Sequence, residues 1–166
     1  MKEMDIGWWD PTKSTLFLLE LKGNEVWQGF DKNKDIAHDH LVKSLKKKAT
    51  DVLLMLAAVW VKTNIGKKIR PTLPKPIHRY RGDGSIKIIF LVDTPTSSIP
   101  LLLAVKDAVN KEIAGRVRLF GVKNVTLINF DEAQNSKLPI ERYTKKGSAP
   151  TRRSAKQLEL YHWKDK

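Results

Sequence analysis

The chain has 166 residues, of which 41% are hydrophobic and 30% are charged, and this composition is typical of a globular domain rather than a disordered chain. The absence of cysteine excludes disulfides and cysteine-ligated zinc or iron–sulfur sites, and it suits a reducing compartment. The formal net charge of +13 favours a polyanionic partner, with nucleic acid first and an anionic membrane surface second.

The first predicted element is a β-hairpin. Its two strands, Ile6–Trp9 and Thr15–Leu21, are rich in strand-forming residues. The residues between them include Asp, Pro and Ser, each of which favours a turn. We expect Asp10 to pair with Thr15 across a four-residue loop, and this pairing fixes the register of the whole hairpin.

In this register three charged residues come together on one face of the hairpin. Asp5 faces Glu20, and Lys22 shares the face of Glu20 because side chains alternate along a strand. Two carboxylates and an ammonium in an otherwise apolar hairpin are costly unless something compensates them. A divalent cation would do so.

A long helix is predicted next, starting near 33–35 and reaching about Thr63, with a break allowed along its length. Its first half is amphipathic, and Lys43 and Lys46 lie on its basic face. Its second half, Asp51–Trp60, is apolar all round and is predicted to be buried.

The segment Lys62–Gly84 is predicted to be a long basic loop on the surface. Three prolines argue against a regular helix, and Asp83 is its only acidic residue. Loops of this length in a compact domain are usually functional or disordered. Its basic residues include Lys67, Lys68, Arg70, Lys75, Arg79 and Arg81.

The next elements predict a parallel pair of strands. Ile86–Val92 has the pattern of a buried strand, a helix follows from about Pro100 to Phe120, and Val125–Phe130 is a second strand. Strand, crossover helix and strand form a right-handed βαβ unit. With the hairpin, this predicts an α/β fold whose mixed sheet is flanked by helices.

Residues 1–140 are predicted to form a single domain, followed by a basic extension over 141–166 that contains Arg152 and Arg153. No signal-peptide pattern opens the chain, and the longest apolar run, Val52–Val61, is too short to span a bilayer. We therefore expect a cytoplasmic protein with no membrane segment.

Asp5, the hairpin, the tripeptide Glu20-Leu21-Lys22 and the helix after it resemble the restriction-endonuclease-like PD-(D/E)XK phosphodiesterases. Members of this family build their site on a sheet from an Asp and an (Asp/Glu)-x-Lys. The resemblance covers roughly residues 4–60, and Ile86–Val92 fits the next core strand.

The chain also departs from the family, whose core begins with a helix and a strand before the metal-binding Asp. Here Asp5 lies almost at the start of the sequence. The missing strand could come from Val125–Phe130, from a second subunit or from sequence outside this chain. Glu3 is a candidate for the acid that the family's first helix often supplies.

The resemblance implies Mg²⁺ or Mn²⁺ as the cofactor, with Asp5, Glu20 and the carbonyl of Leu21 as ligands. Mg²⁺ prefers such oxygen ligands, and it can polarise a phosphate and lower the pKa of a bound water. Lys22 would stand beside the attacking water, either as a base or as an electrostatic clamp. Asp10 is a rival for Asp5, although the hairpin pattern puts it in the turn.

We therefore predict a metal-dependent nuclease, with DNA favoured as its substrate. The alternatives are a non-catalytic basic nucleic-acid-binding protein and an inactive nuclease-like subunit. A homo-oligomer or a partner subunit would be consistent with the missing strand. The predicted nucleic-acid contacts are Lys43, Lys46, Lys67, Lys68, Arg70, Lys75, Arg79, Arg81, Arg152 and Arg153.

Overall fold

The computed structural model describes residues 4–23, 29–30, 33–79, 85–94, 96–136 and 138. Four residues singled out from the sequence lie outside these ranges, namely Glu3, Arg81, Arg152 and Arg153. The predicted basic extension over 141–166 also lies outside them.

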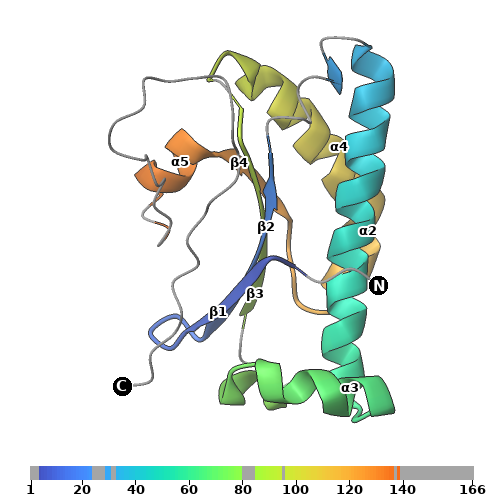
Figure 1. Cartoon of the computed structure of the whole chain (residues 1–166), viewed down its shortest axis with the longest axis vertical. Helices are drawn as coiled ribbons and strands as arrows, with labels where there is room; N and C mark the ends of the chain where they lie inside the picture. The colour runs from blue at the N-terminus through green and yellow to red at the C-terminus, as the bar shows by residue number, and fades with distance from the viewer. Residues whose placement is uncertain are drawn as a thin grey trace.

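The described residues form an α/β fold around a four-stranded mixed sheet (Figure 1). The strands β1 (Ile6–Asp10), β2 (Thr15–Lys22), β3 (Ser85–Val92) and β4 (Thr126–Asn129) are neighbours in that order. β1 is antiparallel to β2, whereas the β2–β3 and β3–β4 pairs are parallel. The predicted combination of a hairpin with parallel strands is confirmed.

The register of the hairpin is also confirmed, since Asp10 pairs with Thr15 and Ile6 pairs with Leu19. Asp10 closes the turn, because its Oδ1 accepts hydrogen bonds from the Thr12 hydroxyl at 2.6 Å and from the Thr12 backbone N–H at 3.0 Å. This is the side-chain turn chemistry expected of an aspartate. Asp10 therefore has a structural role in the turn, at the far end of β1 from Asp5.

β1 lies at one edge of the sheet and β4 at the other. The segment predicted as the strand Val125–Phe130 therefore does not lie beside β1, so it does not supply the extra strand that the resemblance implies. It extends the sheet from β3 instead, because a crossover through α4 (Ile99–Arg118) returns the chain beside β3 and parallel to it.

Two long helices cover one face of the sheet, α2 (Lys34–Trp60) and α4 (Figure 1). Asn33 caps α2, since its side-chain oxygen accepts the Ile36 N–H at 3.2 Å, and the helix begins within the predicted range of 33–35. The helix has no break within its 27 residues. Its second half is not buried all round, because Leu54 is 50% exposed.

The main core lies between these helices and the even-numbered residues of β2 and β3, and it includes Leu45, Ile88, Phe90 and Val105. The odd-numbered residues form a second apolar cluster on the other face of the sheet. The short helix α5 (Phe130–Asn135) covers part of that face. This division decides which side chains of β2 can reach α2.

The prediction of a loop over Lys62–Gly84 was wrong for its first part. The chain forms α3 (Asn64–Ile69) and two 3₁₀ turns, η1 (Arg70–Thr72) and η2 (Lys75–His78). Pro71 and Pro76 occupy the second position of their turns, where the backbone N–H has no partner within the turn and its absence costs nothing. They separate short helices here rather than preventing helix formation.

Within the described residues, no single helix has the length and apolarity needed to cross a membrane. Only α2 taken together with the α3–η1 segment meets those criteria, and the two are bent by 91° at their junction.

Candidate functional site

The charged residues of the Glu20-Leu21-Lys22 motif lie at the carboxyl end of β2, next to the carboxyl end of β3. Glu20 pairs with Phe90 and Lys22 with Val92. The Asp93 N–H donates to the Lys22 carbonyl at 2.8 Å and continues this pairing beyond the strands. The carboxyl ends of parallel strands are where open α/β sheets usually bind ligands.

Glu20 is 3% exposed, and its carboxylate lies between two lysines. Its Oε1 accepts a hydrogen bond from Lys22 Nζ at 2.9 Å, and its Oε2 accepts one from Lys48 Nζ at 2.7 Å. A buried carboxylate is stable only when it is paired and hydrogen-bonded. The two lysines meet that requirement, so the structure brings Glu20 and Lys22 together and adds a third residue.

That third residue, Lys48, comes from the middle of α2 and was not predicted from the sequence. It is 9% exposed and faces the sheet. A signal for it existed, because Lys48 follows Leu41 and Leu45 and precedes Val52 at the spacing of one helical face. A lysine in such an apolar stripe is a candidate for a buried ion pair.

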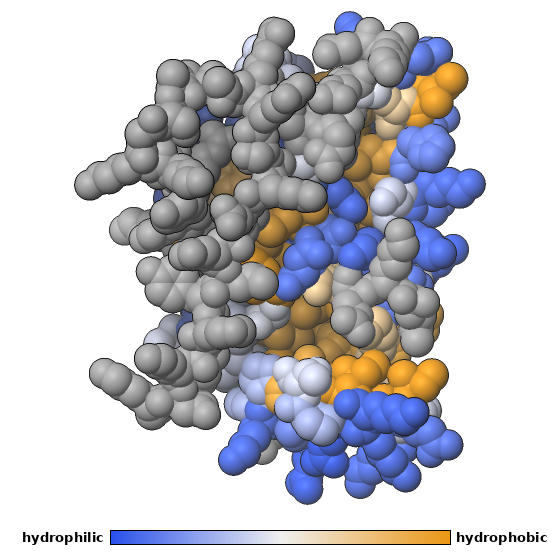
Figure 2. All heavy atoms as spheres, viewed as in Figure 1, coloured by the Kyte–Doolittle hydropathy of each residue, from blue (hydrophilic) through white to orange (hydrophobic). Residues whose placement is uncertain are grey.

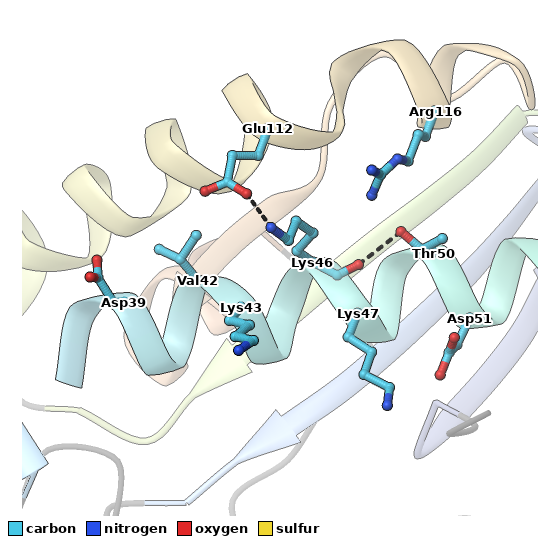
Figure 3. Close-up of a pocket in the computed structure, with 9 residues that line it drawn as sticks. All are labelled: Asp39, Val42, Lys43, Lys46, Lys47, Thr50, Asp51, Glu112 and Arg116. Carbon is cyan, nitrogen blue, oxygen red and sulfur yellow. Dashed lines mark hydrogen bonds and ion pairs between the residues drawn. The ribbon is translucent and has the colours of Figure 1, made fainter. Parts of the chain in front are cut away.

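Lys43 and Lys46 were predicted as nucleic-acid contacts on the basic face of α2, and the structure does not bring them to Glu20. They line an open groove of about 570 Å³ between α2 and α4, together with Glu112 and Arg116 (Figure 3). Lys46 forms an ion pair with Glu112. The reason is the helical period, since Lys43 and Lys46 occupy a different face of α2 from Lys48.

Asp5 lies just before β1, and its carboxylate contacts the backbone of the motif. Its Oδ2 accepts the Leu21 N–H at 2.7 Å, which extends the β1–β2 pairing by a side-chain bond. The Leu21 side chain packs with the apolar cluster on the other face of the sheet. Asp5 itself is exposed, so it faces solvent beside the motif.

The rival acid, Asp10, lies in the turn at the other end of the hairpin. The pKa of Asp10 is lowered from its ordinary value, first because the Thr12 hydroxyl donates to its carboxylate. Backbone N–H groups of Lys13 and Thr12 and the nearby Lys13 ammonium lower it further, against partial desolvation. These contacts explain Asp10 without a role in a metal site.

The charges of the site limit how a metal could bind. The Glu20 carboxylate pairs with two ammonium groups, those of Lys22 and Lys48, while the Asp5 carboxylate accepts the Leu21 N–H. The described part of the chain contains no cluster of three or more His, Cys, Asp or Glu side chains able to hold a metal ion. The site therefore suits Mg²⁺ only if one or two carboxylates bind the ion and if water and substrate phosphates supply its other ligands.

The predicted basic contacts Lys67, Lys68, Arg70, Lys75 and Arg79 follow the carboxyl end of α2, on and after α3. Lys48 precedes the end of α2 at Trp60 by about 12 residues, or roughly 18 Å along the helix axis. These basic residues therefore lie at the other end of the molecule from the Lys22 end of β2 (Figure 1).

No family model, no curated protein and no solved structure matches this chain. The resemblance to PD-(D/E)XK phosphodiesterases stays a hypothesis from the sequence, drawn from Asp5, Glu20 and Lys22 and from the order of the elements around them.

Proposed function

We propose that this protein is a metal-dependent phosphodiesterase of the restriction-endonuclease-like type that hydrolyses nucleic acid, with DNA as the favoured substrate. The observation that carries the proposal is the buried Glu20 carboxylate, held by Lys22 and Lys48 at the carboxyl end of β2. The succession of hairpin, helix and parallel strand around it supports the same assignment.

Asp5 and Glu20 would hold the metal ion, which would polarise a phosphate oxygen and lower the pKa of a bound water. Lys22 would stand beside that water, as a base or as a fixed positive charge. Lys48 would fix the orientation of the Glu20 carboxylate, because it bonds the oxygen that Lys22 leaves free. The bond from the Leu21 N–H would hold Asp5 at the matching depth of the hairpin.

The charges of these residues also make the affinity for the metal depend on the bound substrate. Lys22 and Lys48 both pair with the Glu20 carboxylate, so a divalent cation at Glu20 adds positive charge that this carboxylate does not compensate. A phosphodiester brings negative charge and oxygen ligands to the same place. Metal and nucleic acid should therefore bind this site together more tightly than either binds alone.

The first test compares cleavage of supercoiled plasmid DNA by the wild type and by Asp5→Asn in the presence of Mg²⁺ or Mn²⁺. Asparagine keeps an oxygen that accepts the Leu21 N–H, but it removes the charge needed for the metal. We expect the rate to fall by about 100-fold or more. Lys111→Gln, an exposed change on α4, is the control and should cleave normally.

A second variant tests Glu20 while the net charge of the site stays the same as in the wild type. Glu20→Gln with Lys48→Met removes one negative and one positive charge, and the glutamine oxygen can still accept from Lys22. This variant should fold and should not cleave DNA. Cleavage at the wild-type rate by this variant and by Asp5→Asn would remove both acids from the mechanism.

One observation favours a second candidate function, a nucleic-acid-binding protein without catalysis. Both oxygens of Glu20 are already bound by lysines of the chain itself, as in a structural ion-pair cluster. Binding of DNA that weakens with salt, without any cleavage in Mg²⁺ or Mn²⁺, would support this alternative.

A further inference from the structure

A cluster of cations, here named the basic cap, follows the carboxyl end of α2. No Asp or Glu occurs between Asp51 and Asp83. None of the ion pairs among the described residues involves a member of the cluster. Figure 2 shows hydrophilic side chains gathered at the end of the molecule where Figure 1 places α3. The basic cap consists of Lys62, Lys67, Lys68, Arg70, Lys75 and Arg79.

The backbone of the basic cap begins with a tight junction between α2 and α3. A Cβ on Gly66 would lie 1.9 Å from the Ala58 carbonyl oxygen, so only glycine allows this approach. Thr63 caps α3, because its hydroxyl accepts the Gly66 N–H at 3.0 Å. The angle at which α3 leaves α2 is therefore fixed by close backbone contact.

Three further contacts hold the 3₁₀ turns against the domain. Trp60 Nε1 donates to the Ile77 carbonyl at 2.9 Å, and the Ile77 side chain is buried in the core. The His78 ring bonds the Leu73 carbonyl at 2.9 Å. The cationic side chains, by contrast, are exposed, apart from the half-buried Arg70.

This arrangement places six cations on the segment 62–79, which contains no acidic residue, and the mutual repulsion of these charges opposes it. The negative end of the α3 dipole offsets part of the cost for Lys67 and Lys68, which lie in its last turn. It does not reach Lys75 or Arg79. A polyanion would compensate all six cations at once, and a preordered surface would lose little entropy on binding it.

We infer that the basic cap is an anchoring surface for the sugar-phosphate backbone of nucleic acid, separate from the Glu20 site. The choice of nucleic acid as the occupant follows from charge complementarity and shares the partner class of the proposed function. Binding to the cap needs no metal and no intact catalytic residue. It therefore stands or falls independently of cleavage.

The test measures binding of a mixed-sequence DNA duplex in EDTA over a range of salt concentrations. The cap variant is Lys67→Gln, Lys68→Gln and Lys75→Gln. The matched control is Lys34→Gln, Lys106→Gln and Lys111→Gln, which removes the same charge from α2 and α4. Circular dichroism checks that both fold. An RNA duplex of the same sequence shows which backbone the cap prefers.

We expect the cap variant to bind DNA or RNA about tenfold more weakly or worse, with a salt slope smaller by about 3 because three phosphate contacts are lost. The control should keep most of the affinity and the slope. Equal losses in both variants would mean that net charge alone drives binding and would overturn the proposal. Cap-dependent binding to phosphatidylserine vesicles, with none to DNA or RNA, would also overturn it.

Discussion

Glu20 and Lys48 are separated by 28 positions in the chain, and their side chains meet at 2.7 Å between Oε2 and Nζ. This contact joins the end of β2 to the middle of α2 in a nearly dry environment. The contact compensates part of the charge at the site. The stability and the metal affinity expected of several variants follow from it.

The first prediction concerns the stability of this pair. Glu20→Ala removes the carboxylate that compensates two ammonium groups, and the free energy of unfolding should fall by about 3–5 kcal/mol. Glu20→Leu combined with Lys48→Met should recover most of that loss, because well-packed apolar groups can replace a buried pair. Urea unfolding of Glu20→Leu, Lys48→Met and the double variant measures the coupling between the two residues. If the losses in free energy of unfolding of the single variants simply add in the double variant, the two residues are not coupled and the prediction is wrong.

The second prediction concerns metal affinity in the absence of nucleic acid. Lys48→Met removes a positive charge from the Glu20 oxygen that it contacts. We expect Mn²⁺ to bind this variant about tenfold more tightly than the wild type, because less charge repels it. Electron paramagnetic resonance measures the concentration of free Mn²⁺. Unchanged or weaker Mn²⁺ binding would show that Lys48 does not compete with a cation at Glu20.

The third prediction concerns the hairpin turn and pH. The lowered pKa of Asp10 means that its ionised form stabilises the fold at neutral pH, above its ordinary value of 3.8. That contribution is lost as the pH falls through the lower folded-state pKa. Asp10→Ala should therefore lower Tm at pH 7, and the difference from wild type should shrink below about pH 3.8. A difference that stays constant down to pH 2 would contradict this role.

The fourth prediction concerns the junction that orients the basic cap. Gly66→Ala should destabilise the protein by about 3 kcal/mol, since its Cβ would collide with the backbone of Ala58. Gly115→Ala is the matched control, because nothing lies within 4 Å of a Cβ there and the site is in α4. The control should be stabilised by about 0.5–1 kcal/mol through helix propensity. Thermal unfolding of the two variants should move in opposite directions.

Several features of the protein could be predicted from the sequence because they depend on neighbours along the chain. Alternating side chains and the turn chemistry of Asp10 determine the hairpin register, in which Asp10 pairs with Thr15 and Ile6 with Leu19. Asn33 starts α2 by a cap that the sequence displays. The chemical roles of Asp5, Glu20 and Lys22 stay predictions.

Tertiary structure alone decided the rest. Which face of α2 meets β2 depends on how the helix packs across the sheet, so Lys48 reaches Glu20 while Lys43 and Lys46 line the outer groove. Strand order places β4 at the opposite edge of the sheet from β1. Close packing at Gly66 fixes the start of α3, in a segment that was predicted to be a loop. Contacts between distant residues follow from packing geometry, which local patterns do not encode.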